Sequence, residues 1–481
     1  MAREFVTTTD LLPHQRPAVA KLLPTRAGAM FMDPGTGKSR VLLELARLRQ
    51  DKWDRLFWFT PCALRDNVRE QILIHTDLSP TDVKIWNGSP LEPASLAAIR
   101  FHVIGIESMS ASDRTVLAYN AMRTSKSYVA VDESSYIKGW HARRSQRIIR
   151  MSAKTRYRAI LTGTPFTQGA VDLYSQMFFL SPSILGYRSF WSFAANHLEY
   201  EERKNAFGKK VRTGRILRSH NEEYLAARVA PYTYQIRKDE CLDLPEKLYE
   251  SRYCSLTGEQ EAYYEEAKWE ILSLDYDDWS PIKIFHLFTS LQTIVCGWWK
   301  RPNGALIEMR HRRLDLLLAT LEEIPDTEQV IIWAKYRPAV RAICEALAGI
   351  HGAEQVVPYH GGLAQKDLPR QLDRWRSGAR YLVATQTIGG YGLTLNEAAY
   401  SVFYADSFKY SERVQAEDRT HRIGQTRRPV YIRLRSLSGI DDKIAWALER
   451  KGNALSEFQE QINVYRKQGL RKNAMELVKN L

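Results

Sequence analysis

The segment that could hold phosphate groups is Met32-Asp-Pro-Gly-Thr-Gly-Lys-Ser39, which lies between an apolar run and a helical pattern. Backbone N–H groups around Gly35 and Gly37 can surround phosphate oxygens at the positive end of the following helix. The Lys38 ammonium could then reach the β- and γ-phosphates, and the Ser39 hydroxyl could bind Mg²⁺. A glycine-rich turn without a nucleotide is the alternative, but the strand-loop-helix context favours a phosphate site.

An acidic pair, Asp132-Glu133, directly follows the apolar run Tyr128-Val-Ala-Val131. Open α/β sheets place their ligands at the carboxyl ends of buried strands. Asp132 could hold Mg²⁺ through its water shell, and Glu133 could orient or deprotonate an attacking water. Such a pair is usually a solvated loop by itself, but together with Lys38 it indicates nucleotide hydrolysis.

Arg419 and Arg422 lie three residues apart in Gln415-Ala-Glu-Asp-Arg-Thr-His-Arg-Ile-Gly-Gln425, so they share one face if the segment is helical. That face could deliver two guanidinium groups to a γ-phosphate as arginine fingers. Spacing alone favours a solvated basic face.

Apolar runs that alternate with helical patterns must position these residues. Such runs predict strands at 28–32, 56–59, 101–106, 128–131 and 159–161, and again at 330–333, 356–359, 381–384, 401–404 and 430–434. Parallel sheets covered by helices, in two α/β lobes, are therefore expected. The predicted domains are 1–240, with a helical insertion at about 168–240, and 241–481, with a helical insertion at about 250–305 and C-terminal brace helices at about 440–481.

The order of several motifs resembles that of the Swi/Snf-type ATPases of helicase superfamily two, from about Leu11 to Leu455. The motifs are Leu12-Pro-His-Gln15, Asp33 to Ser39, Asp132-Glu-Ser-Ser135, Leu161-Thr-Gly-Thr-Pro165, Ala384-Thr-Gln-Thr-Ile-Gly-Gly-Tyr-Gly-Leu393 and Gln415 to Gln425. The Arg-x-x-His-Arg-Ile-Gly-Gln ending of the last motif is the most specific.

The resemblance implies two RecA-like P-loop lobes that bind ATP and Mg²⁺ in the cleft between them, with double-stranded DNA across both lobes. Catalytic roles fall on Lys38, Asp132, Glu133, Arg419 and Arg422, and metal binding on Ser39 and Asp132. Nucleotide contacts fall on Gln15, Gly35, Thr36, Gly37, Lys38, Ser39 and Gly390. Gln15 would contact the adenine, 161–165 would link nucleotide state to lobe closure, and Thr385, Gly389 and Gly390 would lie near the DNA backbone and the nucleotide.

The chain departs from the family pattern at three places. Ser135 stands where the family often has His, Thr167 replaces a common Gln although Gln168 is adjacent, and Phe408-Lys409 replaces Trp-Asn. We expect each change to alter coupling between nucleotide and DNA without abolishing hydrolysis.

Composition limits the class of protein further. The 69 Lys and Arg against 55 Asp and Glu give a net charge of +14, which favours polyanionic partners, and 44% hydrophobic residues exclude a disordered chain. Five dispersed cysteines argue against a disulfide framework or a structural zinc site. Apolar runs fall short of the ~20 residues of a membrane span, and the N-terminus lacks a secretion signal, so a cytoplasmic protein is expected.

Two basic clusters are candidates for phosphate contacts, although solvated faces are the commoner explanation. The first contains Arg143, Arg144, Arg147, Arg150, Lys154, Arg156 and Arg158, and the second Lys209, Lys210, Arg212, Arg215 and Arg218. Trp298-Trp299 could stack on an unpaired base, but burial within the insertion is favoured.

The sequence thus predicts a DNA-dependent ATPase that translocates on double-stranded or branched DNA and remodels DNA or protein–DNA complexes, with fork, junction or annealing activity as options. We expect a compact bacterial or phage-like monomer, or a nuclear protein if eukaryotic, without a membrane partner and with a replication, recombination or transcription protein as a possible partner. A strand-separating DNA or RNA helicase, and a nucleic-acid-binding scaffold with weak ATPase activity, are the alternatives.

Overall fold

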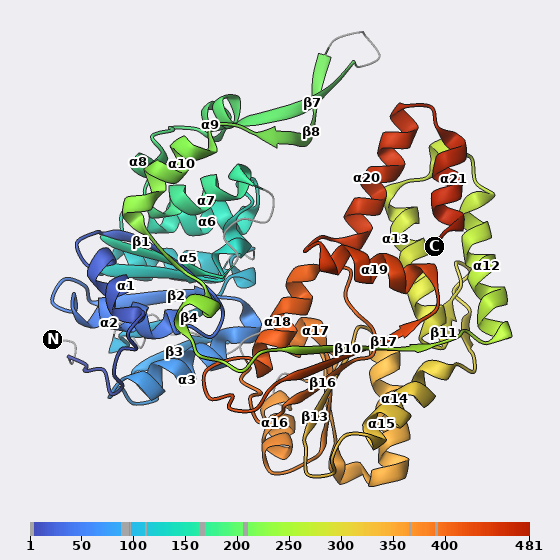
Figure 1. The fold of residues 1–481 in the computed structure, drawn as a ribbon. Coiled ribbons are helices and arrows are strands. Elements are labelled where there is room, and N and C mark those ends of the chain that lie inside the picture. Colours follow the sequence, from blue (N-terminus) through green and yellow to red (C-terminus); the bar gives the residue numbers. More distant parts are fainter. Residues whose placement is uncertain are drawn as a thin grey trace. The chain divides into compact units, whose positions relative to one another are not determined.

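The computed structural model describes residues 4–87, 96, 98–110, 113–163, 169–204, 210–364, 367–389 and 393–481. The chain divides into two compact units, Met1–Asp243 and Leu244–Leu481. Each is an α/β unit built on one parallel sheet (Figure 1). The predicted fold class of two parallel-sheet lobes is confirmed.

The first unit contains a seven-stranded sheet in the order β3-β4-β2-β5-β6-β1-β9, in which all neighbours pair in parallel. Its central strands are buried along almost their whole length, as expected of a sheet covered on both faces. The strands are β1 (Ala27–Met32), β2 (Arg55–Thr60), β3 (Val83–Trp86), β4 (Phe101–Gly105), β5 (Ser127–Asp132), β6 (Tyr157–Thr162) and β9 (Thr233–Ile236).

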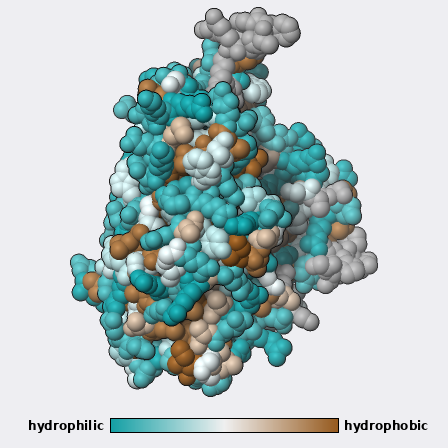
Figure 2. Space-filling view, turned by 90° about the vertical axis from the view of Figure 1, so that its right-hand side faces the viewer, coloured by the Kyte–Doolittle hydropathy of each residue, from teal (hydrophilic) through white to brown (hydrophobic). Residues whose placement is uncertain are grey.

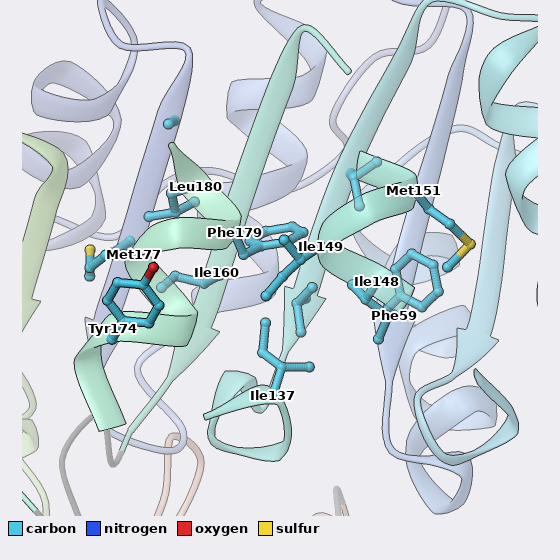
Figure 3. Close-up of a cluster of buried hydrophobic side chains, with 14 of the residues drawn as sticks. Phe59, Ile137, Ile148, Ile149, Met151, Ile160, Tyr174, Met177, Phe179 and Leu180 are labelled. Carbon is cyan, nitrogen blue, oxygen red and sulfur yellow. The ribbon is translucent and has the colours of Figure 1, made fainter. Parts of the chain in front are cut away.

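Helices cover both faces of this sheet and create two apolar cores. Figure 3 shows part of one core, in which side chains of α6 and α7 lie against Ile160 of β6 and Phe59 of β2. The α-helices of the first unit are α1 (Gln15–Leu22), α2 (Lys38–Arg47), α3 (Arg65–His75), α5 (Asp113–Arg123), α6 (Arg143–Ser152), α7 (Ala170–Leu180), α8 (Pro182–Leu185), α9 (Phe190–His197), α10 (Glu222–Val229) and α11 (Lys238–Cys241). Short 3-10 helices lie at η1 (Cys62–Leu64), η2 (Glu107–Ser110), η3 (Ser134–Ile137) and η4 (Ala230–Tyr232).

The insertion after β6 contains more than the predicted helices. Between α9 and α10 the chain forms an antiparallel hairpin, β7 (Leu198–Lys204) and β8 (Lys210–Ser219), which projects away from the helices of the first unit (Figure 1). The chain then returns to the sheet, where β9 pairs with β1.

The second unit contains a six-stranded parallel sheet in the order β10-β17-β16-β13-β15-β14. Its strands are β10 (Leu248–Cys254), β13 (Val330–Ala334), β14 (Val356–Tyr359), β15 (Tyr381–Thr385), β16 (Tyr400–Phe403) and β17 (Val430–Ser436). A short antiparallel pair, β11 (Trp298–Lys300) and β12 (Leu306–Glu308), lies outside this sheet.

The insertion and the C-terminal helices of the second unit share one apolar core, separate from the two cores that flank the sheet. Trp279 and Trp299 are buried in this shared core, whereas Trp269 is 68% exposed. The α-helices are α12 (Gly258–Leu272), α13 (Pro281–Val295), α14 (Arg312–Glu322), α15 (Arg337–His351), α16 (Leu368–Arg376), α17 (Gln386–Gly389), α18 (Tyr410–Thr420), α19 (Gly439–Glu449), α20 (Ala454–Lys467) and α21 (Arg471–Lys479). The 3-10 helices are η5 (Tyr276–Asp278) and η6 (Ala353–Gln355).

One face of the molecule carries its apolar side chains in small groups (Figure 2). Figure 2 shows that these groups are separated by hydrophilic side chains. Scattered apolar residues are normal on folded proteins and do not by themselves indicate a site. Across the residues that the structure describes, every helix is too short or too polar to cross a membrane.

Candidate active site

The candidate phosphate-binding loop runs from the end of β1 to the start of α2. Gly35 and Gly37 both have φ of +85°, a left-handed conformation that glycine adopts without steric cost. The Lys38 ammonium donates to the carbonyl oxygens of Met32 at 2.7 Å and Asp33 at 3.2 Å. The lysine is therefore held at the carboxyl end of β1, where the loop begins.

Gln15 and His14 pack on the same loop from the start of α1. The Gln15 side chain donates from Nε2 to the carbonyl oxygen of Thr36 at 3.1 Å and accepts from the Leu12 backbone N–H at 3.0 Å. His14 Nε2 donates to the same Thr36 oxygen at 2.8 Å. A Cβ on Gly37 would lie only 2.1 Å from Gln15 Nε2, so the close approach of Gln15 requires glycine there. The structure thus places Gln15 against Thr36 and Gly37, the residues that precede Lys38 in the loop.

Asp132 ends β5, and Glu133 follows it in a left-handed conformation with φ of +47°. Asp132 Oδ1 accepts a hydrogen bond from the Glu133 backbone N–H at 3.0 Å, and Thr60 Oγ1 lies 3.5 Å from Oδ2. A positive φ is uncommon outside glycine and indicates local strain, which is often found at functional sites. Glu133 thus lies between the end of β5 and the start of the 3-10 helix η3.

The electrostatics of Asp132 suit a cation. Burial and the neighbouring Glu133 carboxylate raise the pKa of Asp132 to about 7, and the Lys38 ammonium partly opposes the rise. The loop lysine and the acidic pair therefore act on each other at one edge of the sheet. An Mg²⁺ ion fits this site, because a divalent cation would offset the carboxylate repulsion and because hard oxygen donors are its preferred ligands.

The metal would be held by few protein groups. No cluster of three or more His, Cys, Asp or Glu side chains occurs in the described ranges. Magnesium in nucleotide sites is bound by one or two protein oxygens together with phosphate oxygens and water. Asp132 and the Ser39 hydroxyl, on the second residue of α2, would form such a set.

The first-unit insertion is hydrogen-bonded to the segment that follows Asp132-Glu133, through residues that the sequence did not indicate. Ser134 Oγ donates to Gln176 Oε1 at 2.5 Å, and Ser175 Oγ donates to the Ile137 carbonyl at 2.5 Å. Both partners belong to α7. The hydroxyl that reaches the insertion is thus that of Ser134, next to the Ser135 that departs from the family pattern.

The Leu161 to Pro165 motif begins at the end of β6. A Cβ on Gly163 would stand 2.7 Å from Pro34 Cδ, so this glycine allows the motif to lie against the phosphate-binding loop. Thr164, Pro165, Thr167 and Gln168 lie outside the described residues, as does Gly390.

Arg419 lies in the last turn of α18 in the second unit, whereas Arg422 lies two residues beyond the end of this helix at Thr420, so the two do not share one helical face. Both still reach the Leu393 carbonyl oxygen. Arg419 Nη1 donates to it at 3.3 Å, and Arg422 Nη1 at 3.0 Å, with a further bond to Thr394 Oγ1 at 3.0 Å. Burial lowers the pKa of Arg422 from its ordinary value, although Asp418 acts in the opposite direction. The two guanidinium groups therefore converge on one carbonyl oxygen, as a pair that acts on one anion would.

The first basic cluster is partly structural. Arg144 donates to the Tyr136 carbonyl at 3.0 Å, Arg147 to that of Met109 at 2.9 Å, and Arg158 to that of Phe179 at 3.2 Å. Arg143 and Arg150 are exposed on α6 and remain candidates for phosphate contacts.

The second basic cluster lies on β8 and the chain before it. Arg212 lies over the Tyr200 ring, and Arg218 pairs with Glu199 at 2.8 Å. Lys209 lies outside the described residues.

Two protein families match successive parts of the chain. Residues 90–297 match the SNF2-related domain, and residues 312–424 match the helicase conserved C-terminal domain. The first match begins in the first unit and extends into the second, and the second match lies wholly within the second unit.

Individual proteins resemble the chain at lower identity. The human protein named DNA annealing helicase and endonuclease ZRANB3 is 23% identical, with 94% of this chain and 41% of that protein covered. The putative ATP-dependent helicase/translocase YwqA of Bacillus subtilis is 24% identical, with 67% of this chain and 34% of that protein covered. The chain thus spans less than half the length of these relatives. A solved structure, the Sulfolobus solfataricus SWI2/SNF2 ATPase core in complex with dsDNA, is 20% identical with a TM-score of 0.42 and coverage of 93% of this chain and 92% of that one.

Proposed function

We propose that this chain, which belongs to the SNF2-related family of helicase-like ATPases, hydrolyses ATP and uses the reaction to translocate along double-stranded DNA. Movement of this kind would remodel DNA or protein–DNA complexes. The observation that carries the proposal is the convergence of Lys38 and the Asp132-Glu133 pair at one edge of the first sheet.

The residues of the first unit divide the work of hydrolysis among them. Lys38 and the backbone N–H groups of the loop bind the β- and γ-phosphates, and Ser39 with Asp132 holds Mg²⁺. When bound, the ion neutralises charge on the phosphate oxygens. Glu133 orients the attacking water and accepts its proton, and the strained turn at this residue holds its carboxylate beyond the end of β5.

The positive charges of Arg419 and Arg422 stabilise the negative charge that develops on the phosphate oxygens in the transition state. Each guanidinium donates to the Leu393 carbonyl oxygen, which is a neutral acceptor. A γ-phosphate oxygen is charged and would be a stronger acceptor in its place. Loss of such a group typically lowers turnover by about 10³-fold or more.

DNA is proposed as the partner on two grounds. The net charge of +14 favours a polyanion, and the relatives are named a DNA annealing helicase and a helicase/translocase. We further propose that the protein works as a monomer in the cytoplasm of a bacterial or phage-infected cell, with a replication, recombination or transcription protein as partner.

Steady-state ATP hydrolysis tests the function. Wild type should be stimulated by duplex or junction DNA, and Lys38→Ala should abolish the stimulated rate because it removes the cation at the phosphates. Lys52→Ala, which removes an exposed lysine of the same unit, is the matched control and should behave as wild type.

The choice of nucleic acid separates the alternatives. Stimulation by RNA or single strands alone would contradict the duplex motor, and strand displacement on tailed duplexes would identify a true helicase. An absence of hydrolysis with every nucleic acid would leave a binding scaffold.

A further inference from the structure

The chain passes from the first unit to the second between Asp243 and Leu244, and the residues that follow are tied to α18. The Pro245 carbonyl oxygen accepts a hydrogen bond from His421 Nε2 at 3.0 Å. His421 lies between Arg419 and Arg422 in the sequence. We call residues 244–249 the connector strap.

Two side chains of the connector strap meet one carboxylate of α18. Lys247 Nζ lies 2.8 Å from Oε2 of Glu417, and the Tyr249 hydroxyl donates to the same oxygen at 2.7 Å. Tyr249 also stacks on Tyr431 of β17, with ring centroids 5.4 Å apart. Because β10 pairs along its length with β17, the strap is fixed to the sheet at one end and to α18 at the other.

Glu417 is only 4% exposed and depends on these partners. Its second oxygen, Oε1, accepts from Arg413 Nε at 2.8 Å. Burial opposes the charge, but Arg413 and Lys247 hold the pKa of Glu417 at about 2. A buried carboxylate that loses a partner must move or draw in water, so the Lys247 and Tyr249 contacts fix the place of Glu417.

Glu417 precedes Arg419 by two residues, in the last turn of α18. The Glu417 carbonyl oxygen accepts from the backbone N–H of His421 at 3.0 Å and from the Tyr431 hydroxyl at 3.1 Å. Any displacement of Glu417 therefore reaches the backbone that carries both arginines.

We propose that Lys247, Tyr249 and Glu417 are positioning residues for Arg419 and Arg422. In this proposal a displacement of the connector strap moves Glu417 and, with it, the last turn of α18. The inference rests on the proposed function, because it concerns groups assigned to ATP hydrolysis. The arrangement makes the placement of the two guanidinium groups depend on the segment where the chain enters the second unit.

Hydrolysis kinetics of matched variants test the inference. Lys247→Met removes the ammonium and keeps the aliphatic stem, and Tyr249→Phe removes only the hydroxyl. Both should lower kcat, Lys247→Met by up to about 100-fold, because small misplacements of catalytic groups cost this much. The KM for ATP should stay within about twofold, since the phosphate-binding loop is untouched, and Lys247→Arg should restore most of kcat.

Tyr253→Phe is the matched control, because Tyr253 lies on the same strand and is 50% exposed against 48% for Tyr249. It should hydrolyse ATP as wild type does. In an Arg422→Lys background, Lys247→Met should lower kcat much less than it does in wild type. The Arg422 guanidinium that Lys247 helps to position is already absent from that background. An equal loss in both backgrounds would mean a general structural effect and would overturn the proposal.

Hydrogen exchange of the whole chain separates this inference from the proposed function. Lys247→Met should speed exchange of the backbone amides of His421 and Gln425, which bond within the last turn of α18 and just after it. Unchanged exchange would overturn the connector strap whether or not the protein hydrolyses ATP. If exchange is faster but the protein does not hydrolyse ATP, the connector strap does hold the last turn of α18 in place, but it has no role in catalysis.

Discussion

At the scale of single residues, the candidate site contains a carboxyl group, that of Asp132, whose pKa is changed by its surroundings. Asp132 and Glu133 repel each other at the end of β5, and the Lys38 ammonium partly relieves that repulsion. Such opposed charges in a small volume are typical of functional sites. A conservative substitution of Glu133 can separate its proposed role as general base from the binding of nucleotide.

Glu133→Gln should keep the binding of ATP and DNA while it abolishes turnover. The amide has nearly the shape of the carboxylate but cannot accept a proton from water, so only the chemical step is lost. Nucleotide binding by fluorescence and product release in a single turnover are the measurements. Appreciable residual hydrolysis would remove Glu133 from the role of base.

The positions of Lys38 and of the Asp132-Glu133 pair at the carboxyl ends of β1 and β5 could be predicted from the sequence, because both belong to contiguous motifs that directly follow apolar runs. The contacts of Ser134 with Gln176, and of Lys247 with Glu417, could not be predicted. They join side chains far apart along the chain, and only the packing of α7 and α18 brings them together.

At the scale of elements, all ten strands predicted from apolar runs are present in the two sheets. The strands of these two sheets that were missed, β3, β9 and β10, are short or half-exposed. β9 and β10 lie at sheet edges and mix charged or polar residues with tyrosines, so their composition resembles that of a loop. Their place becomes evident only from the partner strands β1 and β17.

β4 carries a buried imidazole that makes the stability of the first unit depend on pH. His102 stacks on Phe57 at 4.7 Å and accepts from Trp86 Nε1 at 3.3 Å. Burial, with a smaller contribution from Arg55, lowers the pKa of His102 to about 3 from its usual 6.5. The neutral ring therefore stabilises the fold fully above pH 6.5, and this contribution is lost as the pH falls from 6.5 towards 3.

Between pH 7.5 and 5.5 the wild type should lose about 1.4 kcal/mol of unfolding free energy through His102. His102→Phe should lose that much less over the same range, in urea unfolding followed by fluorescence. Removal of the exposed His286 is the control and should leave the wild-type difference in place. Equal pH dependence in wild type and His102→Phe would show that this ring is not the source.

At the scale of the whole molecule, the excess of positive charge should govern affinity for DNA more than any single contact. A protein that neutralises about six to ten phosphates loses about 10³- to 10⁵-fold in affinity between 50 and 200 mM salt. We expect a steep, sequence-tolerant salt dependence of this kind for duplex binding, measured by fluorescence anisotropy.

Arg143 and Arg150 are the residues of α6 expected to contribute to that slope. Arg143→Gln should reduce the salt slope by about one, as the loss of one phosphate contact predicts. Arg341→Gln, which removes an exposed arginine paired with Glu308, is the matched control and should leave the slope unchanged. A slope indifferent to Arg143 would return the α6 arginines to the role of solvated charge.

The left-handed backbone at Glu133 has an evolutionary consequence. Glycine would adopt φ of +47° without the steric cost of about 1–2 kcal/mol that a side chain bears in this region. A lineage released from selection on hydrolysis would therefore gain stability by replacing this glutamate with glycine, and the carboxylate would be lost with it. At this residue the backbone conformation therefore favours glycine, whereas the proposed chemistry requires glutamate.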